Sequence, residues 1–184
     1  MNVLIIEGID CSGKSTFLER LSKKLGRGIV IKNCYKPRDQ ETERIKSQYV
    51  RIWDMVLNSS FGPADYIFLD RFYPSQIVYS IKRGHDDFDD SWYRTFEKAL
   101  KTSKLNVVLV LVTEDEKIIR ERFENRGEEY VKPEEITKLQ NRYLSFFDKC
   151  KLRKIKIKST DEFEKNLMEV VRVIKSGKYK FLQR

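Results

Sequence analysis

A short segment near the start of the chain combines glycines, a lysine and hydroxyl side chains at a spacing that suits phosphate chemistry. Residues 8–16 read GIDCSGKST and fit the pattern G-x-x-x-x-G-K-[ST], between an apolar run and a stretch with helical periodicity. Glycines let the backbone approach phosphate oxygens, and the helix start turns unpaired N–H groups and its positive dipole end toward them. Lys14 would reach the β- and γ-phosphates of a nucleotide, and Ser15 would hold Mg²⁺. The segment predicts an ATP-binding loop formed by Gly8, Cys11, Ser12, Gly13, Lys14, Ser15 and Thr16.

An aspartate and an arginine follow an apolar run farther along the chain. Residues 66–69 read YIFL, and Asp70 and Arg71 come directly after them. A carboxylate at the end of a buried strand can reach a metal ion beside a phosphate-binding loop, so Asp70 is the second predicted Mg²⁺ ligand. The guanidinium of Arg71 forms a fork that matches phosphate oxygens. A purely structural Asp–Arg pair at a strand end is the alternative interpretation.

Two further arginines share one face of a predicted helix. Arg122 and Arg126 are four residues apart and lead into Gly127 and a charged segment. This pattern predicts a lid over about residues 126–133, which would carry both arginines to the phosphate in transfer. The alternative is the solvated, charged end of an ordinary helix.

Apolar runs alternate with stretches of helical periodicity along the whole chain, which indicates how these side chains are positioned. Nearly continuous apolar strands between helices favour an α/β fold with a parallel sheet covered on both faces. Ligands of such sheets bind at the carboxyl ends of the strands, where Glu7-Gly8 and Asp70 fall. We find no linker and no repeat, and expect one domain over residues 1–184. The expected strands are 3–6, 29–31, 66–69, 105–112 and 153–158; the expected helices are 14–25, 40–57, 75–82, 91–101, 114–125, 133–149 and 161–175.

Composition excludes several other classes of protein. The chain has 184 residues, 40% of them hydrophobic, and runs such as 107–112 are apolar enough for a sizeable core, so wholesale disorder is excluded. No apolar run approaches the ~20 residues that span a bilayer, and the first residues do not resemble a signal peptide. Cys11, Cys34 and Cys150 are odd in number and widely spaced, as expected of a reduced, cytoplasmic protein. The single histidine, His85, excludes a multi-histidine metal site and is expected in a surface loop.

The net charge of +9 is concentrated near the carboxyl end. Residues 151–184 contain 11 Lys or Arg and 4 Asp or Glu. Such a tail can bind nucleic acid. It can also be an edge strand followed by an amphipathic helix, because Lys154, Lys156 and Lys158 alternate with Ile155 and Ile157.

The chain resembles thymidylate kinases and, more distantly, deoxynucleoside kinases over nearly its full length. Asp10, as the third residue of the loop, is similar to the thymidylate kinase version, where deoxynucleoside kinases usually have Asn. Residues 70–79, DRFYPSQIVY, are similar to the D-R-[YFH]-x-x-S-x-x-A-Y-Q of that family, with Val78 and Ser80 as departures. The lid resembles both families but lacks a third arginine, since residues 128–130 read EEY. Lys36 stands where deoxynucleoside kinases have a general-base Glu.

This resemblance implies a three-layer P-loop fold with a five-stranded, mostly parallel sheet in the order 2-3-1-4-5, and a homodimer. It implies a cytoplasmic, ATP- and Mg²⁺-dependent kinase that phosphorylates a deoxynucleoside monophosphate, dTMP first, with Lys14, Asp70, Arg71, Arg122 and Arg126 as catalytic residues. Asp10 would bind the acceptor sugar, Arg71 its phosphate, and Ser75 or Tyr79 would line the base pocket.

The remaining acceptor contacts are the least certain to transfer from the family. Lys36 is expected near the acceptor, and Gln48 or Arg51 could read the base or bind phosphate at their spacing from Asp70, unless that helix is only a charged and aromatic surface. Two other functions stay open: a deoxynucleoside kinase using Glu7 or Asp70 as its base, and a kinase acting on nucleic acid through the basic tail.

Overall fold

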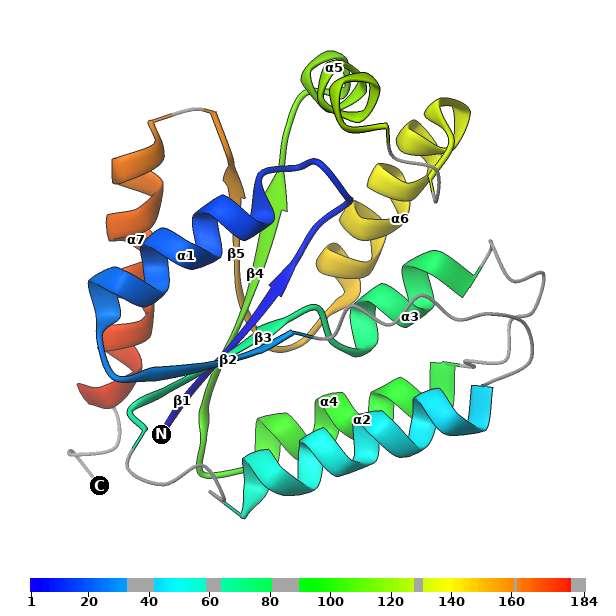
Figure 1. The fold of residues 1–184 in the computed structure, drawn as a ribbon. Helices are drawn as coiled ribbons and strands as arrows, with labels where there is room; N and C mark the ends of the chain where they lie inside the picture. The colour runs from blue at the N-terminus through cyan, green and yellow to red at the C-terminus, as the bar shows by residue number, and fades with distance from the viewer. Residues whose placement is uncertain (33–41, 59–63, 81–89, 128–130, 161, 180–184) are drawn as a thin grey trace.

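The fold is a five-stranded parallel sheet between two layers of helices (Figure 1). The computed structural model describes residues 1–32, 42–58, 64–80, 90–127, 131–160 and 162–179; Cys34, Lys36 and His85 therefore lie outside the described residues. The strand order is β2-β3-β1-β4-β5, and every neighbouring pair is parallel, which confirms the predicted fold class and order. The strands are β1 (Asn2–Glu7), β2 (Gly28–Lys32), β3 (Tyr66–Asp70), β4 (Asn106–Thr113) and β5 (Arg153–Lys158).

Helices cover both faces of the sheet because the central strands are apolar on both faces. Along β1, Val3 and Ile5 pack into one core and Leu4 and Ile6 into another. Figure 1 shows α1 and α7 on one face and α2, α3, α4 and α6 on the other, with α5 beyond the carboxyl ends of the strands. The helices are α1 (Lys14–Leu25), α2 (Thr42–Leu57), α3 (Tyr73–Tyr79), α4 (Asp90–Thr102), α5 (Glu116–Arg126), α6 (Ile136–Lys149) and α7 (Phe163–Tyr179).

Most helix boundaries differ from those predicted by one to four residues, and two of the helices differ in a way that their sequence explains. The helix expected at 75–82 begins at Tyr73, since Pro74 has a φ angle suited to a first helical turn and needs no N–H partner there. The helix expected at 133–149 is divided into a 3₁₀ turn (Pro133–Glu135) and α6. Neither change moves a candidate site residue off its element.

Parallel register brings the predicted site residues to one edge of the sheet. Ile6 lies opposite Asp70, and Glu7 lies opposite Leu111, so the ends of β1, β3 and β4 coincide. The glycine-rich loop leaves β1 at this edge and leads into α1. This edge therefore collects side chains that are far apart in the sequence.

The basic residues of β5 are largely occupied in structural contacts. Ile155 and Ile157 are buried, as predicted for an edge strand. The Lys154 ammonium donates to the carbonyl oxygens of Phe147, Asp148 and Cys150 at 2.6, 2.9 and 2.9 Å, and so caps the carboxyl end of α6. Lys158 pairs with Asp115 at 2.7 Å. Among the described residues, no helix is long and apolar enough to cross a membrane.

Replacing Lys154 by Met should lower the free energy of unfolding by about 1–2 kcal/mol, because three carbonyl groups lose a charged donor at a helix end. The control is Lys156→Met on the same strand, where the side chain is exposed and has no hydrogen bond or ion pair within the described residues. Urea unfolding of both variants measures the difference. Equal stability of the two would contradict the capping role.

Candidate active site

The lysine of the glycine-rich loop is paired with the aspartate that ends β3. Lys14 is the first residue of α1, and its ammonium lies 2.7 Å from Oδ1 of Asp70. Their side chains are 9% and 5% exposed. A buried cation and carboxylate are tolerated only when they are paired, so each holds the other in place. The structure thus joins the predicted phosphate-binding lysine to the predicted metal ligand.

Two glycines allow the loop to pack tightly against neighbouring elements. Gly8 has φ +149°, and a Cβ there would lie 2.3 Å from the carbonyl oxygen of Val112 on β4. Gly13 has φ +87°, and a Cβ there would lie 2.7 Å from the Ser159 side chain. Only glycine accommodates both the dihedral angles and these close approaches. The loop is therefore held against β4 and against the segment that follows β5.

Arg71 joins the loop to α3 and α6. It has φ +68°, an uncommon value for a residue with a side chain. One terminal nitrogen donates to Asp10 at 2.5 Å, and the other donates to the Tyr143 hydroxyl at 2.9 Å and to Ser75 at 3.2 Å. A guanidinium carries more N–H donors than these three bonds use, so it keeps donors for a further anion.

Asp10 is held in its ionised form by this arrangement. Burial raises the pKa of Asp10, but the charges of Arg71 and Lys14 and a 2.8 Å hydrogen bond from Tyr79 outweigh it, so the pKa lies below its usual range. The predicted substrate residues Asp10, Arg71, Ser75 and Tyr79 therefore form one connected group.

Glu7, the last residue of β1, contacts Ser75 and Tyr143 of this group. Its carboxylate accepts hydrogen bonds from the Phe72 N–H at 2.7 Å and from the Ser75 hydroxyl at 2.6 Å, and the Tyr143 hydroxyl lies at 3.4 Å. Burial raises the pKa of Glu7 despite the nearby charge of Arg71. We did not predict Tyr143 as a site residue, because its spacing from Ile136, Leu139 and Phe146 is that of a buried helix face.

The two predicted lid arginines both reach the loop from α5. Arg122 donates to the carbonyl oxygen of Cys11 at 3.0 Å, and a terminal nitrogen lies 3.7 Å from a Glu114 oxygen. Arg126 is exposed, and its terminal nitrogen is 4.0 Å from the sulfur of Cys11. Part of the predicted lid, residues 128–130, lies outside the described residues.

Glu114 was not predicted from the sequence. It is buried at the end of β4 and accepts hydrogen bonds from Ser159 and Thr160 at 2.5 and 2.9 Å. Burial raises the pKa of Glu114, but these hydrogen bonds and Arg122 outweigh it and lower the pKa overall. Glu114 thus anchors both Arg122 and the segment after β5 beside the loop.

Comparison with known proteins shows which proteins this chain resembles in sequence and in fold. No model of a protein family matches the chain. It is 27% identical over 144 residues to YorR, an uncharacterized protein of the SPbeta prophage in Bacillus subtilis strain 168, and the match covers 78% of this chain and 80% of YorR. The crystal structure of YorR in complex with phosphorylated GDP superimposes with a TM-score of 0.75 at 21% identity, covering 95% of this chain and 96% of YorR.

Two kinase structures are also similar. Thymidylate kinase from Candida albicans gives a TM-score of 0.60 at 18% identity, covering 96% and 92% of the two chains. Deoxyadenosine kinase from M. mycoides gives 0.55 at 16% identity, covering 96% and 99%. The chain has the fold of the P-loop nucleotide kinases. Because kinases for different acceptors share this P-loop kinase fold, the acceptor has to be argued from the site itself.

The remaining predicted residues fit a P-loop kinase fold to different degrees. Ser15 and Thr16 are exposed at the start of α1, where a nucleotide can reach them. The Ser12 hydroxyl is buried in the loop without a hydrogen-bond partner in the described part of the chain. Gln48 is half-buried and Arg51 exposed on α2, and the contacts of Asp10 and Arg71 given above do not include them.

The donor set beside the loop fits ATP and Mg²⁺. Among the described residues, no cluster of three or more His, Cys, Asp or Glu side chains could hold a metal by itself. Mg²⁺ in kinases is usually held by few protein oxygens together with phosphates. Asp70 and the accessible hydroxyl of Ser15 supply such oxygens, next to the N–H groups of the first turn of α1.

Replacing Asp10 by Asn should lower the free energy of unfolding at pH 7 by about 1–3 kcal/mol, because Arg71 loses a charged partner. The pKa of Asp10 is lower in the folded protein than its ordinary value of 3.8. The contribution of this carboxylate to the free energy of unfolding is therefore complete above about pH 3.8 and is lost as the pH falls through the folded-state pKa. Urea unfolding of both proteins should show the difference shrinking toward acid. The control is Asp65→Asn, at an exposed aspartate whose carboxylate makes no ion pair with a described residue, and it should change the free energy of unfolding little at pH 7. A pH-independent effect of Asp10→Asn would refute the ion-pair explanation.

Proposed function

We propose that the protein transfers the γ-phosphoryl group of ATP to a deoxynucleoside monophosphate, with dTMP as the first acceptor to test. The observation that carries the proposal is the buried Arg71 guanidinium, which keeps N–H donors for an anion. Arg71 directly follows Asp70 in the chain, and its partner Asp10 is also under the influence of the Lys14 charge. A second phosphate binding there would lie next to the phosphates held by the loop. The choice of dTMP as the acceptor, and of a homodimer as the assembly, comes from the resemblance of the sequence to thymidylate kinases.

On the donor side, each group has a role that follows from its position. Lys14 has three ammonium donors, so it can keep Asp70 and still bind phosphate oxygens. Bound Mg²⁺ would bridge the β- and γ-phosphates and offset their charge, with Ser15 and Asp70 as its protein oxygens. Arg122 and Arg126 would act on the charge of the phosphoryl group in transfer.

The carboxylates at the site favour a phosphate acceptor over a sugar hydroxyl. A hydroxyl needs a general base within hydrogen-bond reach, whereas a phosphate oxygen is already a nucleophile. Glu7 is buried with both oxygens occupied by the Phe72 N–H, Ser75 and Tyr143. Asp70 has one oxygen bonded to Lys14, and its other oxygen is the one assigned to Mg²⁺ in this proposal. Neither is positioned as an available base. The deoxynucleoside kinase alternative is therefore less well supported.

A coupled assay with ATP and a panel of acceptors tests the proposal. The panel holds the four deoxynucleoside monophosphates, GMP and the four deoxynucleosides; GMP is included because the structure of YorR contains phosphorylated GDP. We expect turnover with a monophosphate, highest with dTMP, and little with any nucleoside. Turnover with deoxynucleosides alone would overturn the choice of acceptor, and turnover with none of the panel would overturn the proposed reaction.

Replacing Arg71 by Lys should raise the KM for the acceptor monophosphate by about 10–100-fold and leave the KM for ATP nearly unchanged. A point charge cannot reproduce the bidentate contact of a guanidinium. Tyr143→Phe keeps the arginine but removes one of its supports, so we expect a smaller increase in the same constant. A parallel rise in the KM for ATP would instead assign Arg71 to the donor or to the fold.

Replacing Arg126 by Ala should lower kcat by about 10²-fold with little change in ATP affinity, because an exposed arginine makes few contacts before the phosphoryl group moves. Arg122→Ala should affect both kcat and ATP affinity, since Arg122 already braces the loop at Cys11. The matched control is Arg120→Ala on the same helix, whose guanidinium pairs with Glu116. If Arg126→Ala behaves like this control, Arg126 has no role in the transfer.

A further inference from the structure

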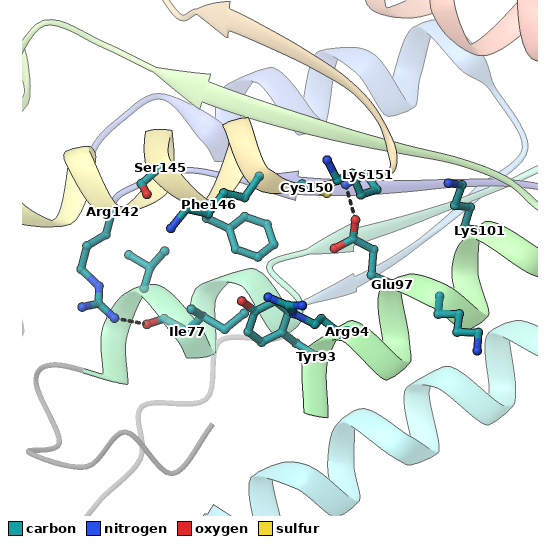
Figure 2. A pocket seen from close by; sticks show the side chains of 13 residues that line it. Ile77, Tyr93, Arg94, Glu97, Lys101, Arg142, Ser145, Phe146, Cys150 and Lys151 are labelled. Atoms are coloured by element: carbon teal, nitrogen blue, oxygen red, sulfur yellow. Dashed lines mark hydrogen bonds between the residues drawn. The ribbon is translucent and has the colours of Figure 1, made fainter. Parts of the chain in front are cut away.

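A cavity between α3, α4 and α6 lies away from the P-loop (Figure 2). Its volume is about 740 Å³, within the range of small-molecule sites. One end is formed by Cys150 and Lys151, just before β5 begins. Because Ser159 at the other end of β5 packs against Gly13, this end of the cavity and the loop are separated by the length of a strand, roughly 20 Å. No residue of the P-loop lines the cavity.

Aromatic rings form part of its wall. Tyr93 of α4 and Phe146 of α6 have ring centroids 6.0 Å apart at an angle of 62°. On its other side Tyr93 stacks on Tyr73, with centroids 6.3 Å apart and planes 12° apart. Figure 2 shows both rings between the helices, with Ile77 of α3 beside Tyr93. These rings give the cavity an apolar, aromatic wall against which a planar ring can pack.

Positive charge surrounds this apolar wall. The single carboxylate among the lining residues, Glu97, is buried and accepts a hydrogen bond from the backbone N–H of Lys151. Arg142 donates to the carbonyl oxygen of Ile77 at 2.7 Å and to Ser80 at 3.0 Å. The basic residues that line the cavity are Arg94, Lys98, Lys101, Arg142, Lys149 and Lys151.

Four of these cations have no partner in the part of the chain that the structure describes. The ammonium groups of Lys98, Lys101, Lys149 and Lys151 make no hydrogen bond or ion pair with another described residue, and all four side chains are exposed. Like charges around one concavity repel each other, and an anion bound between them removes that cost. The lysines therefore favour an anionic ligand, and the aromatic rings favour one that also contains a planar ring.

We propose that this cavity is a second binding site, for an anionic molecule of nucleotide size that joins a planar ring to phosphate groups. The ring would stack against Tyr93 and Phe146, and the phosphates would lie among the lysines. A small molecule fits better than a nucleic-acid strand, because the rings lie within a concavity, whereas strands track along extended charged grooves. The site goes beyond the proposed kinase reaction, since neither the donor nor the acceptor residues take part in it.

Calorimetric titration of the full chain with dATP, dGTP, dCTP and dTTP tests the proposal. The variant is Lys98→Glu/Lys149→Glu, and the matched control is Lys117→Glu/Lys138→Glu, which makes the same change of net charge at exposed lysines outside the cavity. For at least one nucleotide we expect two binding events on the wild-type chain. The double variant should weaken one of them by about tenfold or more and keep the other, while the control keeps both. If charge reversal prevents folding, Lys98→Gln/Lys149→Gln replaces it.

Other outcomes would overturn the second site. These are a single binding event for every nucleotide, or isotherms that are the same for the cavity variant and its control. Two further results would contradict the nucleotide site and assign the surface another role. If the cavity variant loses binding of a single-stranded oligonucleotide and no second nucleotide event exists, the surface binds nucleic acid. If the cavity variant changes the sedimentation coefficient and leaves nucleotide binding unchanged, the surface is an interface between copies of the chain. Binding is measured without an acceptor, so failure of the kinase assay leaves this result independent.

Discussion

A positively charged guanidinium buried at the carboxyl edge of the sheet is the constraint on which the candidate site depends. Burying a charge costs several kcal/mol unless partners compensate it. The partners of Arg71 come from separate elements: Asp10 from the glycine-rich loop, Ser75 from α3 and Tyr143 from α6, with Glu7 of β1 behind them. Satisfying one buried cation therefore fixes the relative positions of four parts of the chain.

The same group is close to electrical balance. Lys14 pairs with Asp70 and Arg71 pairs with Asp10, so two cations face two carboxylates. Nucleotide phosphates bring several negative charges into such a balanced site, so they need cations from outside it. Mg²⁺ and the arginines of α5 would supply them, and Arg122 already lies on the loop. The charges within the site therefore largely compensate one another, and the additional positive charge comes from α5.

Patterns that repeat locally were sufficient to predict the sheet, its covered faces and the loop that contains Lys14. The position of Asp70 at the same edge as the loop was also predictable, because parallel strands end at one edge. Its ion pair with Lys14 was not predicted and is seen only in the folded chain. Contacts that depend on distant segments were not predictable in this way. Tyr143 has the spacing of a core residue, and only the folded chain shows its hydroxyl against Arg71. Likewise, the alternation of Lys154 with isoleucines predicted an edge strand but not the cap on α6, and the cavity arises from three helices that no local pattern relates.

The position of β1 in the middle of the sheet has a consequence for how the chain is made. Asn2 pairs with Tyr66 on one side and with Asn106 on the other, so the first strand to be synthesised has no complete set of partners until β4 exists. At ribosomal speeds of about 5–20 residues per second, this delay is roughly 5–20 s. Until then β3 can pair with one edge of the apolar strand Val3–Ile6 and the other edge has no partner strand, so the complete sheet forms only after β4 has been made. A force profile of the stalled nascent chain should accordingly show its main folding signal only after β4 has left the exit tunnel.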